Sequence, residues 1–135
     1  MAAIEIIERK PTVAEYNRLL EAVGWPKRNP TAVEAGLART LFAVCAISNG
    51  EVVGMGRVVG DGAIVNYIQD VIVLPEYQKQ GIGENILLAI MDHLNEHVPR
   101  GSDVALITRR ENVNFYERYG FAESLHNIPS MRRKL

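Results

Sequence analysis

The most informative stretch of the sequence is Val71-Ile72-Val73-Leu74-Pro75-Glu76-Tyr77-Gln78-Lys79-Gln80-Gly81-Ile82-Gly83. An apolar strand pattern ends at Pro75, a polar loop follows, and two glycines stand at the start of a strongly amphipathic helix predicted over 82–98. The first N–H groups of a helix have no partner within it, and the helix dipole favours negative charge there. Gly81 and Gly83 permit close approach to those amides. The stretch therefore predicts an anion site that suits a phosphate or pyrophosphate.

The common phosphate-binding motifs do not fit this loop. A Walker loop requires Gly-x-x-x-x-Gly-Lys-Ser/Thr, which is absent. A dinucleotide fingerprint requires a third glycine where Ile86 stands. Gly54-Met55-Gly56 lies inside a predicted strand and no helix follows it.

The flanking sequence predicts an α+β fold. We expect strands over 3–7, 41–47, 51–59, 63–74 and 104–108, a closing strand pair over 121–125 and 130–135, and helices over Thr12–Val23, Thr31–Arg39, 82–98 and 112–119. Asn49-Gly50 between two apolar runs indicates a hairpin. The expected architecture is a mixed, mostly antiparallel sheet of six to seven strands, flanked by about four helices.

Composition limits the function classes. A chain of 135 residues fits a single domain, 1–135, and its formal net charge of −1 gives no general attraction to nucleic acid. The N-terminal run alternates charged residues with short apolar runs, so we expect neither a signal peptide nor a membrane span there. The single cysteine, Cys45, cannot form an internal disulfide, which fits a reducing cytoplasm, and its apolar neighbours indicate a buried hydrophobe rather than a nucleophile.

Two motifs resemble one family. Gln78-x-x-Gly81-x-Gly83 before a long helix resembles the coenzyme A loop of the GNAT superfamily, the Gcn5-related N-acetyltransferases. Downstream, the run from Asn112 to Phe121 resembles the family's Asn...Phe-Tyr-x-x-x-Gly-Phe segment. The resemblance implies the GNAT fold, also called the acyl-CoA N-acyltransferase fold. It also implies transfer of the acetyl group of acetyl-CoA to a primary amine, directly within a ternary complex.

The resemblance also assigns the residues that bind acetyl-CoA. The backbone amides of the loop are expected to hold the pyrophosphate, at Gln78, Lys79, Gln80, Gly81, Ile82, Gly83 and Glu84. The strand edge at Val71, Ile72 and Val73 is expected to bind the pantetheine arm, and one of its amides can polarise the thioester carbonyl. Asn112 is expected to contact the pantetheine side as well.

Tyr116 matches the family tyrosine that donates a proton to the departing thiolate. A phenol with a pKa of about 10 is protonated at neutral pH and can serve as an acid. The alternative is that Tyr116 is one more core aromatic, beside Phe115 and Tyr119.

Asp70 interrupts the apolar strand just before the expected pantetheine edge. An amine attacks a thioester only in its neutral form, so a carboxylate base is useful here. Asp70 is a candidate for that base, for an anchor of the acceptor ammonium, or for a structural partner of the neighbouring strand. Glucosamine-phosphate acetyltransferases of the superfamily carry Glu-Asp where this chain has Gln69-Asp70, and an amide cannot act as a base.

Acceptor recognition is expected from Trp25, Arg57 and Tyr67, together with Gln69. Trp25 is alternatively a lid packed on the core, and Arg57 a surface residue. An inward Arg57 would favour an anionic group on the acceptor. His93 and His97 have helical spacing, but no further ligands accompany them, so we expect solvated histidines and no metal.

Three functions follow for comparison. The first is a small-molecule N-acetyltransferase, the second a protein or peptide N-acetyltransferase, and the third a non-catalytic acyl-CoA-binding module, which would have no use for the Tyr116 acid. A homodimer is possible, because dimers are common in the family.

Overall fold

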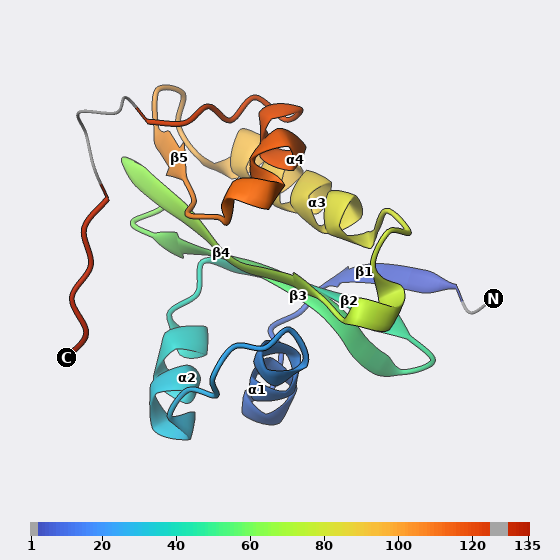
Figure 1. The fold of residues 1–135 in the computed structure, drawn as a ribbon. Helices are drawn as coiled ribbons and strands as arrows, with labels where there is room; N and C mark the ends of the chain where they lie inside the picture. The colour runs from blue at the N-terminus through green and yellow to red at the C-terminus, as the bar shows by residue number, and fades with distance from the viewer. Residues whose placement is uncertain (1–2, 125–129) are drawn as a thin grey trace.

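The computed structural model of the chain describes residues 3–124 and 130–135. One sheet has the strand order β1-β2-β3-β4-β5, with helices on both faces (Figure 1). The antiparallel strands are β1 (Ile4–Glu8), β2 (Phe42–Ser48), β3 (Glu51–Gly60) and β4 (Val65–Val73), and β5 (Asp103–Ala105) runs parallel to β4. The predicted α+β class with a mixed, mostly antiparallel sheet is confirmed.

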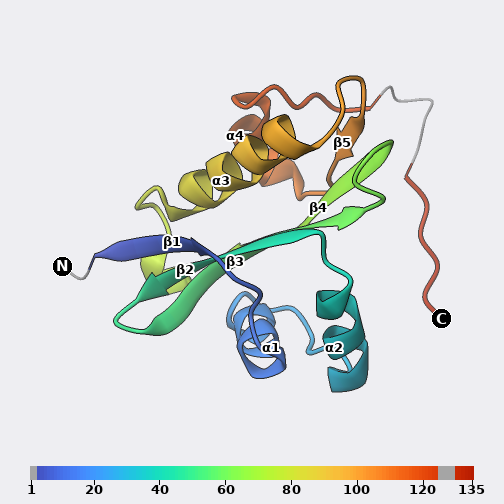
Figure 2. The same cartoon turned by 180° about the vertical axis from the view of Figure 1, so that it is seen from behind.

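The helices form two layers. Helices α1 (Val13–Ala22) and α2 (Pro30–Ala38) cover one face of the sheet, and α3 (Ile82–His97) and α4 (Val113–Glu117) lie on the other, as the reverse view also shows (Figure 2). Two short 3₁₀ turns, η1 (Pro75–Tyr77) and η2 (Arg110–Asn112), precede α3 and α4. In the described part of the chain, no helix is long and apolar enough to cross a lipid bilayer.

The strand count is lower than predicted. Within the described residues the sheet has five strands, because 121–124 and 130–135 form no strand. The remainder of the predicted closing pair, 125–129, lies outside the described residues. The strand predicted over 104–108 ends at Ala105. Its three residues pair only with the first part of β4, so the apolar pattern beyond Ala105 meets no neighbouring strand.

Local sequence signals explain most element boundaries. Asn49 and Gly50 both have positive φ, 50° and 79°, which is the hairpin conformation that Asn-Gly predicts. Thr12 caps α1 in a capping box with Glu15. The predicted cap of α2, Thr31, is wrong. The side chain of Asn29 accepts hydrogen bonds from the backbone amides of Thr31 and Ala32, and Pro30 is the first residue of the helix.

Helix α3 packs closely on the sheet because β3 has glycines beneath it. A Cβ at Gly56 would lie 2.7 Å from Ile86 Cγ2 and 2.9 Å from Ile90 Cδ1, both fully buried. Cys45 is also fully buried, and its Sγ donates to the carbonyl of Arg9. Burial raises the pKa of the Cys45 thiol, so the expected inert hydrophobe is confirmed.

Two glycines, Gly56 within β3 beneath α3 and Gly36 within α2, should respond oppositely to alanine. Gly56→Ala overpacks the α3 interface and should lower the free energy of unfolding by about 1–3 kcal/mol. Gly36→Ala places its methyl group in open space within α2 and should raise it by up to about 1 kcal/mol. Urea unfolding measures both changes. An unchanged free energy of unfolding in Gly56→Ala would show that α3 does not need this close approach to the sheet.

Candidate functional site

Strand β4 separates from β5 after a short paired segment. Only Val65, Asn66 and Tyr67 pair with β5, opposite Asp103, Val104 and Ala105. Figures 1 and 2 show the two strands together at one end of β4 only. The edge of β4 that faces β5 therefore lacks a strand partner over 68–73 among the described residues. Such an edge can pair with an extended ligand.

The alternating direction of the peptide groups along β4 shows which residues turn their N–H and C=O groups to this edge. The N–H of Leu74 donates to Val53 O of β3 at 2.8 Å. Neighbouring residues in a strand turn their peptide groups to opposite edges, so Val71 and Val73 present theirs to the free edge and Ile72 faces β3. The side-chain amide of Gln78 donates to Val73 O at 2.9 Å, which joins the following loop to this edge.

The loop before α3 leaves a run of amides without protein partners. Lys79 and Gly81 have positive φ, 63° and 81°, and Gly81 is the N-cap of α3. Among residues 3–124 and 130–135, no protein acceptor takes the amides of 79–84. A Cβ on Gly81 would meet no atom within 4 Å, and one on Gly83 would lie 3.9 Å from Val73 Cγ2. Amides without partners at a helix N-terminus are the features on which an anion can bind, and here they lie beside the free edge.

Tyr116 lies on α4 with its ring between two other aromatic side chains. Its centroid is 5.0 Å from Phe115 and 6.0 Å from Phe121, both edge-on. Burial raises the pKa of Tyr116, so the phenol stays protonated over the neutral range. Its hydroxyl forms no hydrogen bond within the described residues. Asn112, at the start of α4, is exposed.

Asp70 occupies a β-bulge. Gln69 lies opposite Arg57 and Ile72 opposite Met55, so two residues of β4 face one of β3. Asp70 has a φ of 57° and a side chain only 5% exposed. Its Oδ2 accepts from Arg57 Nε at 2.7 Å and from the Tyr16 hydroxyl at 2.8 Å. These contacts match the structural alternative among the three roles that the sequence allows.

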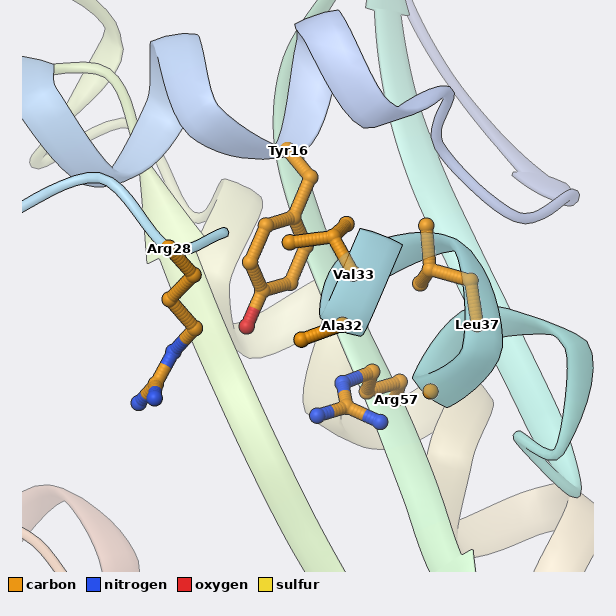
Figure 3. A pocket seen from close by; sticks show the side chains of 7 residues that line it. Tyr16, Arg28, Ala32, Val33, Leu37 and Arg57 are labelled. Atoms are coloured by element: carbon orange, nitrogen blue, oxygen red, sulfur yellow. The ribbon is translucent and has the colours of Figure 1, made fainter. Parts of the chain in front are cut away.

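A pocket of about 270 Å³ opens beside this cluster, on the face covered by α1 and α2. Figure 3 shows the side chains that line it. They are Tyr16, Arg28, Ala32, Val33, Gly36, Leu37 and Arg57. Arg57 therefore points inward, toward α1 and α2, as the anionic-acceptor hypothesis requires.

Sequence reasoning missed Tyr16 and Arg28. Tyr16 belongs to the apolar stripe of α1, which predicts a core residue, and burial together with the Asp70 carboxylate raises its pKa. Arg28 is held by Asn17, whose side-chain amide donates to Arg28 O at 3.1 Å and accepts from Arg28 N at 2.9 Å. Arg28 stands between the first two predicted helices, at a position to which the sequence alone assigns no role, and the structure places the cap of α2 at the next residue, Asn29.

The remaining predicted acceptor residues are not all together. Tyr67 and Gln69 lie opposite Val59 and Arg57, so the register turns them to the face that carries the pocket. Trp25 packs partly buried against the core and does not line the pocket, which matches the lid alternative.

The helix histidines are stacked. The His93 ring lies 3.8 Å from Phe42 and 4.3 Å from His97, measured between centroids. Partial burial lowers the pKa of His93, and the charge of the neighbouring His97 lowers it further. His93 is thus partly packed, in contrast to the predicted solvated residue. In the residues that the structure describes, no three His, Cys, Asp or Glu side chains are grouped to hold a metal ion.

Comparisons with known proteins agree on one family. A profile described as "Acetyltransferase (GNAT) domain" matches residues 21–129. An "Uncharacterized N-acetyltransferase ycf52" of Pyropia yezoensis is 26% identical, over 87% of this chain and 68% of that protein. "Serotonin N-acetyltransferase 2, chloroplastic" of Oryza sativa is 31% identical, over 82% of this chain and 56% of the rice protein. A Staphylococcus aureus crystal structure described as "Probable Acetyltransferase" has a TM-score of 0.92 and 30% identity, covering 98% of this chain and all of that one.

The buried cluster gives a stability prediction. Asp70→Asn leaves the Arg57 guanidinium without its counter-ion and should lower the free energy of unfolding by about 3 kcal/mol. Tyr16→Phe removes one hydrogen bond and should cost about 1 kcal/mol. Urea unfolding of both variants provides the comparison. Equal losses would mean that the ion pair contributes no more than the hydroxyl does.

Proposed function

The chain belongs to the GNAT acetyltransferase family, and from that premise we propose that it transfers the acetyl group of acetyl-CoA to a primary amine of a small molecule, directly within a ternary complex. One observation carries the proposal. The unpaired edge of β4 lies beside a loop whose amides 79–84 have no protein acceptor among the described residues. An elongated ligand with a diphosphate at one end fits both features.

The amides of 79–84 would hold the pyrophosphate. Residues of positive φ, here Lys79 and Gly81, allow successive N–H groups of a loop to converge on an anion, and the α3 dipole adds positive potential. Lys79 adds a positive side chain to the loop, and the first turn of α3 carries the negatively charged Glu84. The backbone therefore supplies most of the expected attraction.

The free edge of β4 would bind the pantetheine arm as a substitute strand. Val71 and Val73 present peptide groups there, and Val73 O is already engaged by Gln78. When bound, acetyl-CoA supplies an acetyl group activated as a thioester. The Val71 amide is suited to donate to the carbonyl oxygen, which gains negative charge as the amine adds.

Tyr116 would supply the proton for the departing sulfur. Its phenol is neutral at physiological pH, and its hydroxyl has no partner in the described part of the chain. Asp70 would act as a positioning residue rather than as the base, because its Oδ2 already accepts two hydrogen bonds. The acceptor nitrogen would then lose its proton to solvent.

The pocket supports a small acceptor over the alternatives. Its volume of about 270 Å³ is near the lower end of small-molecule sites, whereas a peptide would require an extended groove. A protein or peptide acceptor remains the second candidate, and a non-catalytic acyl-CoA-binding module the third. A cytoplasmic location and a homodimer stay predictions.

Replacing Gly81 tests the anion site. Gly81→Ala strains a residue of positive φ and places a methyl group where the diphosphate would approach, so the affinity for coenzyme A should fall about tenfold. Gly101→Ala is the matched control, because Gly101 also has positive φ, 89°, and open space around its Cα. Calorimetry with coenzyme A measures both variants. Absence of heat from the parent protein would refute the proposed function.

Replacing Tyr116 tests the acid. Tyr116→Phe retains the ring packing and removes only the proton donor, so kcat should fall about 100-fold while coenzyme A binding is retained. Tyr119→Phe, in the same segment, serves as the control. Thiol release from acetyl-CoA against an amine panel gives the rates. Turnover of Tyr116→Phe at the parental rate would exclude this role for Tyr116.

A further inference from the structure

We propose that the pocket between α1, α2 and β3 binds an acidic group, so that the acceptor is an amine that also carries a carboxylate or a phosphate. The inference rests on the proposed acetyltransferase function and names the chemistry of its acceptor. Both oxyanions present the oxygen acceptors that a guanidinium binds in a planar, paired geometry.

The two arginines that line the pocket carry more positive charge than the neighbouring Asp70 carboxylate neutralises. Arg57 is paired with Asp70 through Nε, and its Nη1 donates to Thr40 Oγ1 at 3.2 Å. Arg28 has no carboxylate within 4.0 Å among the described residues. No Asp or Glu side chain lines the pocket. The local balance is therefore one guanidinium in excess.

Arg28 is presented from a fixed backbone. Asn17 is buried on α1 and binds both the N–H and the carbonyl of Arg28. Asn29 follows immediately and caps α2. These hydrogen bonds hold the backbone of Arg28 and of the residue that follows it. Binding of an anion by the Arg28 side chain therefore costs little additional backbone entropy.

The opposite wall is apolar and has unused space. Ala32, Val33, Gly36 and Leu37 of α2 form this wall, and a Cβ at Gly36 would meet no atom within 4 Å. The wall suits a short hydrocarbon segment between the acidic group and the amine.

Arg57 relates the pocket to the proposed acetyl-transfer edge of β4. Arg57 lines the pocket and contacts Asp70, the residue that precedes the free β4 edge at Val71. An acceptor whose acidic group contacts the guanidinium groups would extend its other end along this cluster toward that edge. Anion recognition and amine placement then occur at opposite ends of one small molecule.

Paired probes test the inference. 4-Aminobutyrate is compared with butylamine, and O-phosphoethanolamine with ethanolamine, by calorimetry on protein saturated with coenzyme A so that the loop at 78–84 is filled. Thiol release from acetyl-CoA is measured in parallel. At least one acidic probe should bind about tenfold tighter than its neutral partner, in line with a charge-assisted hydrogen bond. The tighter acidic probe identifies carboxylate or phosphate.

Three variants localise the effect. Arg28→Gln should remove most of the preference for the acidic probe. Lys27→Gln is the matched control, because Lys27 is the adjacent cation, is paired with Glu21 and lies outside the pocket. Gly36→Leu fills the pocket without altering its charge and should weaken the acidic probe at least tenfold, with the coenzyme A affinity retained.

The outcomes separate the two proposals. Coenzyme A binding together with an Arg28-dependent preference supports both. Three outcomes would overturn the acidic acceptor and leave the acetyltransferase proposal intact, provided that coenzyme A binds. They are equal affinity for acidic and neutral probes, no heat from either acidic probe, and a preference for the acidic probe that survives Arg28→Gln. Absence of coenzyme A binding overturns the proposed function and this inference with it.

Discussion

The ion pair between Arg57 and Asp70 is the interaction on which the rest of the site depends. It joins β3 to β4 at the bulge, and the Tyr16 hydroxyl extends it to α1. The Asp70 side chain is almost fully buried, so its charge requires these partners. Because Asp70 has positive φ, the contacts also hold a backbone conformation that few non-glycine residues adopt. The pocket and the free β4 edge meet at this one cluster.

Much of the candidate site consists of backbone N–H and C=O groups rather than side chains. Within the described residues, two neighbouring sets of peptide groups lack backbone partners: those at the β4 edge, where only Val73 O accepts from the Gln78 side chain, and the amides of 79–84. Such groups require a partner, from water or from a ligand. Gly54 and Gly56 allow α3 to approach the sheet, and Gly83 at its N-terminus lies beside Val73. Close helix packing therefore brings the two sets together.

Elements whose limits depend on nearby residues could be predicted from the sequence. The apolar strand, the glycine loop and the amphipathic α3 were predicted almost to the residue, because caps, turns and periodicity act over a few positions. The cap of α2 was misplaced because Asn29 and Thr31 are both good caps, and the proline between them decides in favour of Asn29. The late strands were overpredicted because an apolar run forms a strand only where a neighbour pairs with it.

The α+β class and the order of elements could be predicted from sequence alone, and so could the loop at 78–84 and Tyr116 as candidate site residues, since each depends on neighbouring residues or on a motif. The contacts of Asp70, the inward direction of Arg57 and the position of Tyr16 and Arg28 in one pocket became visible only in the folded chain. The physical reason is separation along the chain: Tyr16 and Asp70 are 54 positions apart, and only strand register and helix packing bring their side chains within hydrogen-bond distance.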